Sequence, residues 1–361
     1  MRFYKISTLF LGIFLALFFC LSCQNSDKKE IDSNPIKLLF GGDILLDRGV
    51  RVEIEKKGIV SLFDSLKPIF DEYKSENDFI LANLECPLVN QNTPIPKRFS
   101  FGAPTHYADS LKNIGFTHLF LANNHTNDHH RKGLSSTFYS LKKNGIIGIG
   151  YGETHSESCK PVFIEKENTK IAIFSVVRVP LESWHRMENK PSICQASTTE
   201  LVEKIKQLRK KEPQIIIIIS LHWGTEYKFL PKAEQRKEAY LLTKAGADAI
   251  IGHHPHVTQS IEFVNDKPVF YSLGNFVFDQ EGELKDRCIL TGFEIQSREI
   301  NSILIYPLQI KNAVPQFFAE KDSVKKSIFE KKLKILSKGV IFEKVLKPNT
   351  KNYSSFLIRN K

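Results

Sequence analysis

The chain has 361 residues, of which 42% are hydrophobic and 25% are charged, and its formal net charge is +11. This composition is typical of a folded globular protein, and it excludes a disordered or fibrous chain. A chain of this length buries most of the surface that it exposes when unfolded, so its fold does not depend on disulfide bonds. It has room for one large domain or two small ones.

The first 23 residues have the three-part pattern of a secretory signal. Arg2 and Lys5 form a short positive region, and an apolar run from Leu9 to Leu21 follows. This run is shorter than the ~20 residues that cross a membrane comfortably. Cys23 follows a small residue, as in the lipobox of bacterial lipoproteins, where the cysteine becomes the lipidated first residue. An uncleaved N-terminal anchor is the alternative, and both predict a membrane-anchored protein outside the cytoplasm, at the cell surface or in the periplasm.

Four parts follow from this pattern: a signal peptide at 1–23, a polar tether at 24–35, a single domain at 36–312 and a basic tail at 313–361. The segment Gln316–Lys361 holds twelve Lys or Arg and four Asp or Glu, a net charge of +8, whereas the body is nearly neutral. Such a tail can bind anionic lipid, an acidic polymer or nucleic acid, and of these we expect no nucleic acid. The plainer alternative is a solvated amphipathic helix with a frayed end.

Short apolar runs alternate with helical patterns from residue 36 onward, which predicts an α/β fold with a mixed sheet and flanking helices. The run Ile215–Ile219 consists of five β-branched residues and predicts a strand buried on both faces. Gly115 and Gly145 end two helical patterns, as a left-handed C-cap requires. The expected strands are Ile36–Phe40, Phe79–Asn83, Thr117–Ala122, Ile171–Val177, Ile215–Leu221, Ala249–Ile251, Val269–Ser272, Arg287–Ile295 and Ser302–Ile310. The expected helices are Pro104–Ile114, Leu134–Asn144, Thr198–Lys211 and Lys232–Ala245.

The four cysteines of the body are widely spaced and form no C-x-x-C pair, which argues against a zinc ribbon or a redox motif. One disulfide bond can form among them in an oxidising compartment, and the sequence leaves the pairing open. These residues are Cys86, Cys159, Cys194 and Cys288.

Polar residues follow directly after most of the predicted strands. In open α/β sheets the ligand crevice lies beyond the carboxyl ends of the strands, so we expect these side chains to meet at one edge. Each has a plain alternative, since Asp43 can cap a turn and His222 can be a core histidine. Three histidines within Gly252–His256 are hard to explain by packing, and mixed carboxylate, amide and imidazole groups are ligands of hydrolytic dinuclear sites. The strand-end residues are Asp43, Glu85, Asn124, His125, Asp128, His222, Glu226, His253, His254, His256 and Asn275.

These motifs, in this order, resemble those of the calcineurin-like metallophosphoesterases and, more closely, those of the CapA-type poly-γ-glutamate capsule proteins. The resemblance extends from Ile36 to Ile310 and implies a metallophosphoesterase-like layered sandwich. The stretches that carry it are Gly42-Asp43, Asn83-Leu84-Glu85, Leu121–Thr126 with Asp128, Leu221–Gly224 with Glu226, Gly246–Asp248, Gly252–Val257 and Tyr271–Phe276.

The resemblance implies metal ligands. Asp43 and His256 would ligate a first metal ion, and Glu85 would replace the usual bridging aspartate. A second ion would be held by Asn124, His222 and His254. The ions would be divalent, with manganese, iron, zinc and magnesium all open.

One feature departs from the metallophosphoesterase pattern. The first motif of those enzymes supplies Asp-x-His, whereas Asp43 is followed by Ile44 and Leu45. The first site is therefore one imidazole short, and a single metal ion is the alternative to two.

The resemblance also implies roles beyond metal binding. His125 would protonate or stabilise the leaving oxygen. Asp128 would orient His125, or would only begin the next helix. Outside the ligand set, His253, Glu226 and Asn275 would contact the ligands or the substrate.

Three functions fit this pattern. The first is a CapA-like protein that assists synthesis, export or anchoring of an anionic cell-surface polymer such as poly-γ-glutamate, together with capsule-synthesis membrane proteins. The second is a metal-dependent hydrolase that acts on a phosphoester outside the membrane. The third is a non-catalytic binding protein with a structural metal site. A fold does not fix chemistry, so whether the chain is an enzyme stays open.

Overall fold

The computed structural model describes residues 35–166, 168–282, 284–345 and 355–361. The predicted signal peptide, Cys23 with it, and all of the predicted tether except its last residue lie outside these ranges. Within them, no helix combines the length and the apolar character that crossing a membrane requires.

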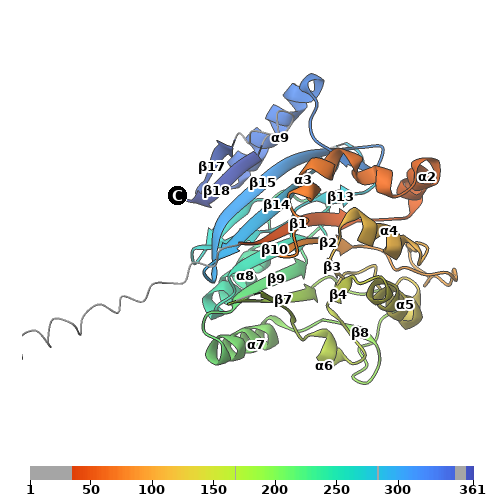
Figure 1. The fold of residues 1–361 in the computed structure, drawn as a ribbon. Coiled ribbons are helices and arrows are strands. Elements are labelled where there is room, and N and C mark those ends of the chain that lie inside the picture. Colours follow the sequence, from red (N-terminus) through yellow and green to blue (C-terminus); the bar gives the residue numbers. More distant parts are fainter. Residues whose placement is uncertain (1–34, 167, 283, 346–354) are drawn as a thin grey trace, which may run out of the picture.

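The larger of two sheets lies at the centre of Figure 1 and has ten strands in the described part of the chain. They are β1 (Ile36–Ile44), β2 (Asp78–Leu84), β3 (His118–Phe120), β4 (Ile147–Ile149), β13 (Asn275–Val277), β14 (Arg287–Gln296), β15 (Glu299–Lys311), β16 (Val314–Gln316), β17 (Val340–Val345) and β18 (Ser355–Asn360). The order is β17-β18-β15-β14-β1-β2-β3-β4, with β13 beside β1 and β16 beside β15. Strands β1 to β4 are parallel, and β14 joins β1 antiparallel.

The second sheet is also mixed. Its strands are β6 (Val162–Lys166), β7 (Thr169–Val177), β9 (Ile216–His222), β10 (Ala249–His253), β11 (Ile261–Val264) and β12 (Lys267–Phe270). They lie in the order β11-β12-β10-β9-β7-β6. The four central strands are parallel, and the two outer ones are antiparallel to their neighbours. A short separate pair joins β5 (Tyr151–Gly152) to β8 (Ser192–Ile193).

The two sheets pack face to face, and their facing apolar side chains form a core between them. Successive side chains of a strand point to opposite faces, so each strand also contributes to an outer core. Leu38 and Phe40 of β1 enter the core between the sheets, and Leu39 enters the outer core. In β9, Ile218 faces the inner core and Ile217 the outer one. The isoleucine run is therefore buried on both faces, as its composition predicts.

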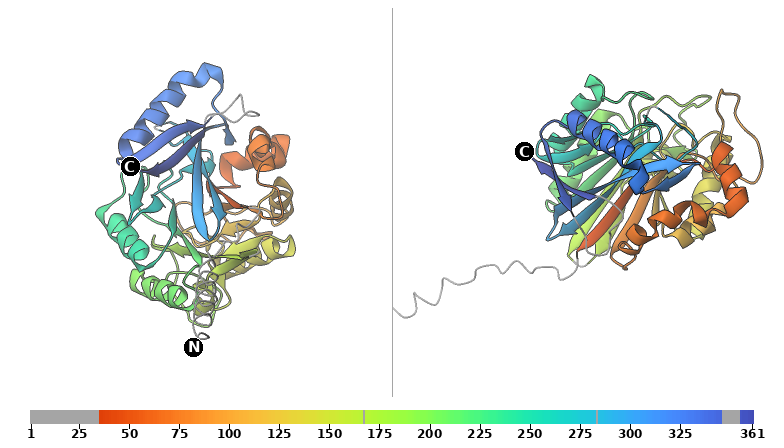
Figure 2. Two further views of the ribbon diagram at one scale, coloured as in Figure 1. Left: turned by 60° about the vertical axis from the view of Figure 1, so that its left-hand side comes forward. Right: turned by 90° about the horizontal axis from the view of Figure 1, so that it is seen from above.

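Helices cover the outer faces of both sheets (Figures 1 and 2). On the large sheet these are α2 (Arg48–Lys57), η1 (Val60–Leu66), α3 (Lys67–Asp71), α4 (Tyr107–Ile114) and α5 (His130–Lys143). On the second sheet they are α7 (Thr198–Lys211) and α8 (Ala233–Ala245). The remaining helices are α6 (His155–Ser158), η2 (Glu320–Asp322) and α9 (Ser323–Leu336). The result is a layered sandwich of two mixed sheets between helices, so the predicted fold class is confirmed.

The segment expected to be a basic tail extends the fold in its described part. Strand β18 pairs with β15, and β17 pairs with β18. Phe356 and Ile358 of β18, together with Phe329 and Leu333 of α9, belong to the core between the sheets. Apolar residues between the lysines thus pack these elements onto the body. The described part of this segment is therefore not the solvated helix with a frayed end that was the plainer alternative.

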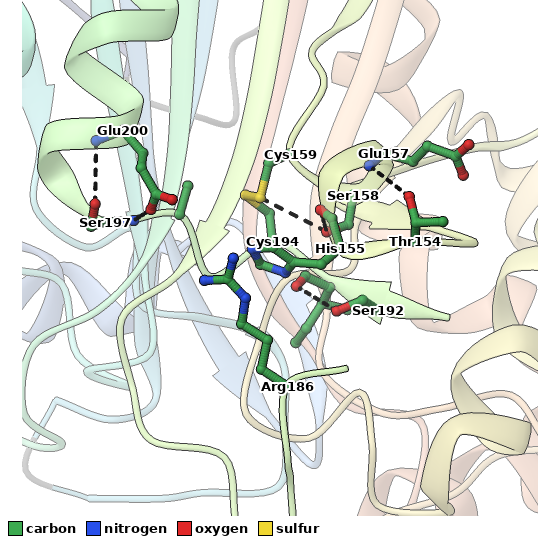
Figure 3. Close-up of a disulfide and its surroundings, with 12 residues drawn as sticks. Thr154, His155, Glu157, Ser158, Cys159, Arg186, Ser192, Cys194, Ser197 and Glu200 are labelled. Atoms are coloured by element: carbon green, nitrogen blue, oxygen red, sulfur yellow. Dashed lines mark hydrogen bonds between the residues drawn. A yellow bond between two sulfur atoms is a disulfide. The ribbon is translucent and has the colours of Figure 1, made fainter. Parts of the chain in front are cut away.

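A disulfide bond joins Cys159, just after α6, to Cys194, just after β8 (Figure 3). The other two cysteines of the body, Cys86 and Cys288, are free and buried. The bond closes a loop across 35 positions of sequence. In the chain-entropy picture a closure of this size stabilises a fold by about 4 kcal/mol. The pairing that the sequence left open is thereby settled.

Candidate metal centre

The carboxyl ends of both sheets meet at one place. Asp43 lies near the end of β1, while His222 and His253 end β9 and β10 of the second sheet. The segment before β13 joins the two, because the Asp43 amide donates to the carbonyl of Gly274 at 3.1 Å. A Cβ atom on Gly42 would lie 1.9 Å from that same carbonyl oxygen, so only glycine permits this approach.

Two carboxylates form the floor of the site. Asp43 and Glu85 are both fully buried. The Asn83 side chain donates to Asp43 Oδ1 at 2.8 Å and to Glu85 Oε2 at 3.1 Å, and so fixes the pair. Asn123 donates in turn to Asn83 Oδ1 at 3.0 Å. Both asparagines stand in the strand-end motifs, but their part in holding the carboxylates was not predicted.

Burial favours a higher pKa for both carboxylates, but their net pKa shifts are opposite. Burial alone would raise the pKa of Asp43, but hydrogen bonds and charges from His253 and His256 outweigh it and hold that pKa well below its usual range. The pKa of Glu85 is raised well above its usual range, by burial first and then by the Asp43 carboxylate. Asp43 is thus ionised, whereas Glu85 favours its protonated form, and a bound cation would displace that proton.

His256 stands against both carboxylates. Its Nε2 is 3.5 Å from Glu85 Oε1, and its Nδ1 is 3.5 Å from Asp43 Oδ2. The same Nδ1 lies 2.9 Å from Oδ1 of Asn275, so Nε2 is the nitrogen left for a ligand. The predicted position of Asn275 beside the cluster is therefore observed.

His222, Asn124 and His254 form the other side. His222 Nε2 is 2.7 Å from Asn124 Oδ1 and 4.0 Å from Glu85 Oε1. The rings of His222 and His254 have centroids 4.9 Å apart. Burial and then the charge of His254 lower the pKa of His222, and burial and then the charge of His256 lower that of His254 to about 3. Both imidazoles are neutral near pH 7, as metal ligation requires.

The turn that carries His254 and His256 is strained. His254 and His256 have φ values of 96° and 56°, on either side of Pro255. Positive φ is uncommon for residues other than glycine and costs free energy, of order 1–3 kcal/mol for each residue. The surrounding structure therefore aims these two rings at the carboxylates at the expense of local backbone stability.

The residues present fit a divalent metal ion. Glu85 Oε1, His222 Nδ1 and His254 Nδ1 are buried atoms without a hydrogen-bond partner among the described residues. Such orphaned atoms are costly unless something binds them. Donor atoms of Glu85, His254 and His256 lie within 4.8 Å of one another, and so do those of Asp43, Glu85 and His222. Carboxylate and imidazole groups together suit manganese, iron and zinc.

His253, which was predicted to contact the ligands or the substrate, lies against the candidate ligand Asp43. Its side chain is 1% exposed, and its Nδ1 lies 3.3 Å from Asp43 Oδ1. It therefore brings an imidazole to the carboxylate that lacks the histidine of an Asp-x-His motif.

A second cluster adjoins the first through the segment after β3. His125 Nδ1 lies 2.9 Å from Asp128 Oδ2, and the Phe101 amide donates to the same oxygen at 2.7 Å. The buried Lys97 ammonium pairs with Asp128 Oδ1 and lies 3.4 Å from His125 Nδ1. Burial lowers the pKa of His125, and Asp128 only partly opposes the effect. Asp128 is thus placed to orient His125, and it makes no cap bond to α5, whose N-cap is His129.

One residue of the second cluster was not predicted, and one predicted residue is exposed. Lys97 was not predicted, because it stands in a long connection without a motif and 31 positions before its partner Asp128. Glu226 was predicted to contact the ligands or the substrate; its side chain is exposed, its charge adds to the raised pKa of Glu85, and its role stays a prediction. The other predicted site residues lie in the two clusters, and their individual roles stay predictions.

Fold and site together define a layered α/β protein with a buried carboxylate–imidazole cluster where the strands of two sheets end. The chain belongs to the family described as bacterial capsule synthesis protein PGA_cap, which matches residues 37–280. It is 30% identical to the PGA biosynthesis protein CapA of Bacillus subtilis over 84% of this chain and 79% of that protein. It is 26% identical to the capsule biosynthesis protein CapA of Bacillus anthracis over 88% of this chain and 77% of that protein.

More distant similarities extend this set. A probable polyglutamine synthesis accessory protein of Mycobacterium tuberculosis is 27% identical over 68% of this chain and 75% of its own length. Among solved structures, a 5'-nucleotidase precursor from Thermus thermophilus aligns with a TM-score of 0.46 at 13% identity. That alignment covers 83% of this chain and 58% of the nucleotidase.

Proposed function

We propose that this chain is an exported, lipid-anchored CapA-type protein that uses a divalent metal site in the synthesis, export or anchoring of an anionic cell-surface polymer of the poly-γ-glutamate type. The observation that carries the proposal is that five buried ligand groups meet where both sheets end: Asp43, Glu85, His222, His254 and His256. The similarity to two CapA proteins, named for PGA biosynthesis and for capsule biosynthesis, supports a polymer of this type as the one on which the chain acts.

A divalent ion would be held by carboxylate and imidazole atoms that the fold has already gathered. Asp43, Glu85 and His256 would form one part of the shell, and His222, His254 and Asn124 the other. When bound, the ion would act as a Lewis acid on a substrate oxygen. The protein would fix the carboxylates through Asn83, and Asp128 would hold the orientation of the His125 ring.

Export is supported by the disulfide bond. Cys159 and Cys194 lie at bonding distance, and such bonds persist in oxidising compartments rather than in the cytosol. The signal-like N-terminus and the lipidation of Cys23 remain part of the proposal. Metabolic labelling with a palmitate analogue should mark the wild-type chain and leave Cys23→Ala unmarked, and equal labelling would overturn the anchor.

Attachment to an anionic membrane surface has support in α9. Val324, Ile328 and Ile335 lie along one face of this helix and are 69%, 56% and 59% exposed. Lys325 and Lys331 are exposed on the same helix. Apolar residues flanked by lysines favour the plane of an anionic lipid surface, and a lipid chain plus a basic patch hold a protein there more firmly than either alone.

The second candidate is a phosphoesterase unrelated to a capsule, which the same ligand groups would serve. The test compares complementation with catalysis. In a host strain that lacks the gene, wild type should restore surface-bound polymer, and Glu85→Gln should not. If Glu85→Gln restores surface-bound polymer as well as wild type does, a role for the metal site is overturned. Metal-dependent hydrolysis of a model phosphodiester, with surface polymer unaffected by the gene deletion, would favour the second candidate.

A further inference from the structure

A cavity of about 850 Å³, a volume typical of ligand-binding clefts, lies at the start of α5, and its lining residue His129 stands five positions after the candidate ligand Asn124. One wall is the first turn of α5, and the other is the loop that carries Trp184 and His185. The segment between β3 and α5 connects the two sites, because Asn124 and His125 face the metal centre while His129 lines the cavity.

The lining of this cavity is basic. Its formal positive charges are those of Arg131 and Lys132, beside the imidazoles of His129, His130 and His185, and none of the described lining residues is Asp or Glu. An exposed acid of the same loop, Glu188, pairs instead with Arg186 at 2.7 Å. A concave surface lined with one sign of charge concentrates ligands of the opposite sign.

The first turn of α5 is basic against its own electrostatic preference. A helix N-terminus carries partial positive charge and favours acidic side chains. Here the first turn has Arg131 and Lys132 and no acid, and the N-cap residue His129 makes no side-chain cap bond. This arrangement does not favour the helix, and it leaves positive charge at the cavity that an anionic ligand would neutralise.

The opposite wall is fixed before any ligand arrives. The Arg131 guanidinium lies 4.0 Å from the centre of the Trp184 ring and donates to the carbonyls of His185 and Pro191. Trp184 Nε1 donates to Gln195 at 2.8 Å. The disulfide at Cys194 closes the chain segment that holds this loop. Preorganised walls reduce the ordering cost of binding.

We propose that this cavity binds a stretch of an anionic polymer that carries a carboxylate on each residue, and so presents the chain to the neighbouring metal centre. The inference deepens the proposed function and rests on it for the identity of the polymer. Basic side chains would pair with successive carboxylates, and the Trp184 ring would pack against the aliphatic part of the chain.

Binding of a fluorescently labelled oligo-γ-glutamate to the full-length protein, followed by anisotropy at low salt, tests the proposal. The double variant His130→Gln/Lys132→Gln should bind at least about tenfold more weakly, because both side chains are exposed at the cavity. The matched control is Lys142→Gln/Lys143→Gln, which removes exposed charge from the last turn of the same helix and should bind as wild type does. Equal affinity of the two double variants would overturn the proposal.

Two further arms separate this site from the metal centre and from general charge attraction. His254→Ala, and wild type in chelator, should keep the affinity for the oligomer, so failure of the metal site leaves the cavity result readable. Loss of binding in both would assign the ligand to the metal centre instead. Inorganic polyphosphate should bind more weakly than oligo-γ-glutamate, and tighter or equal binding of polyphosphate would overturn the carboxylate assignment.

Discussion

His125 and His254 lie in adjoining buried clusters, yet we expect different roles for them. His254 has a buried Nδ1 without a partner, whereas His125 is held by the Asp128 carboxylate. His254→Ala should therefore strip metal from the protein. His125→Ala should keep the metal content while hydrolysis of a model phosphodiester, if wild type shows it, falls by roughly a hundredfold. Metal analysis and a rate assay on the same preparations check this.

The control for that comparison must lie outside both the centre and the cavity. His185 stands in no strand-end motif, but it lines the cavity and is unsuitable. His106 is exposed at the start of α4 and packs on Tyr107. His106→Ala should match wild type in metal content and rate. Equal metal content in His254→Ala and His106→Ala would contradict the proposed ligand.

His118 predicts a pH dependence of stability. Burial, and then the charge of Lys112, lowers its pKa to about 4, from an ordinary value of 6.5. Between these values the unfolded chain binds more protons, so the free energy of unfolding falls as the pH drops from 6.5 toward 4. The full effect is roughly 3 kcal/mol. His118→Leu should unfold with a flatter pH profile than wild type in chemical denaturation with chelator present. Parallel profiles would show that His118 is not the cause.

At the residue scale, the sequence predicted the ligand types better than their supports. Asp43, Glu85 and the His254–His256 pair follow strands, and strand ends converge in α/β folds. Lys97 could not be predicted, because nothing local marks its long-range pairing with Asp128. His253 was predicted to contact the ligands or the substrate, but its pairing with Asp43 was not, because that pairing depends on how the two sheets pack.

At the scale of elements, the C-terminal segment supplies core rather than a loose end. Deletion of residues 316–361 removes Phe318, Phe329, Leu333, Phe356 and Ile358, all buried. Each contributes about 1.5–3 kcal/mol of burial. The deleted form should lose cooperative unfolding or melt about 10 °C or more below wild type in calorimetry. An unchanged melting temperature would show that this segment is dispensable.

Helix α9 and the residues just after it carry a separate prediction about surfaces. The triple variant Lys325→Gln/Lys331→Gln/Lys338→Gln should keep the fold, because all three side chains are exposed. Near an anionic surface each lysine contributes ~1 kcal/mol, so partitioning onto phosphatidylserine vesicles should fall about a hundredfold. Vesicle sedimentation of the two proteins measures the effect.

A matched triple variant on α7 provides the control. Lys206, Lys210 and Lys211 are exposed on that helix, which covers the second sheet. Their replacement by Gln removes the same charge and should leave vesicle binding near the wild-type value. If both triple variants lose binding equally, net charge rather than α9 directs the protein to the surface.

The secondary structure was predictable where local pattern decides it. The α7 prediction, Thr198–Lys211, agrees with the observed bounds, and Ser197 and Glu200 form the capping box that begins this helix. The division of the strands into two sheets was not predictable, because strand periodicity shows which residues are buried but not which sheet buries them. The helices α2 and α3 were missed for a similar reason, since their apolar residues lie in a connection without a clear pattern.

At the scale of the whole molecule, two sheets that end at one edge bring carboxylates from one and imidazoles from the other to a single place. Neither sheet alone holds Asp43, Glu85, His222 and His254 together. The site therefore depends on the packing between the sheets, and metal bound there would stabilise the assembled fold by linkage between binding and folding.

The most direct measurement is the metal content of the purified full-length protein, by elemental analysis, beside Glu85→Gln, His256→Ala and His106→Ala. We expect about one or two equivalents of a divalent metal in wild type and His106→Ala. The other two variants should hold little metal, and their melting temperature should no longer rise when metal is added. The same metal content and the same melting temperature in all four proteins would contradict the strand-end metal centre.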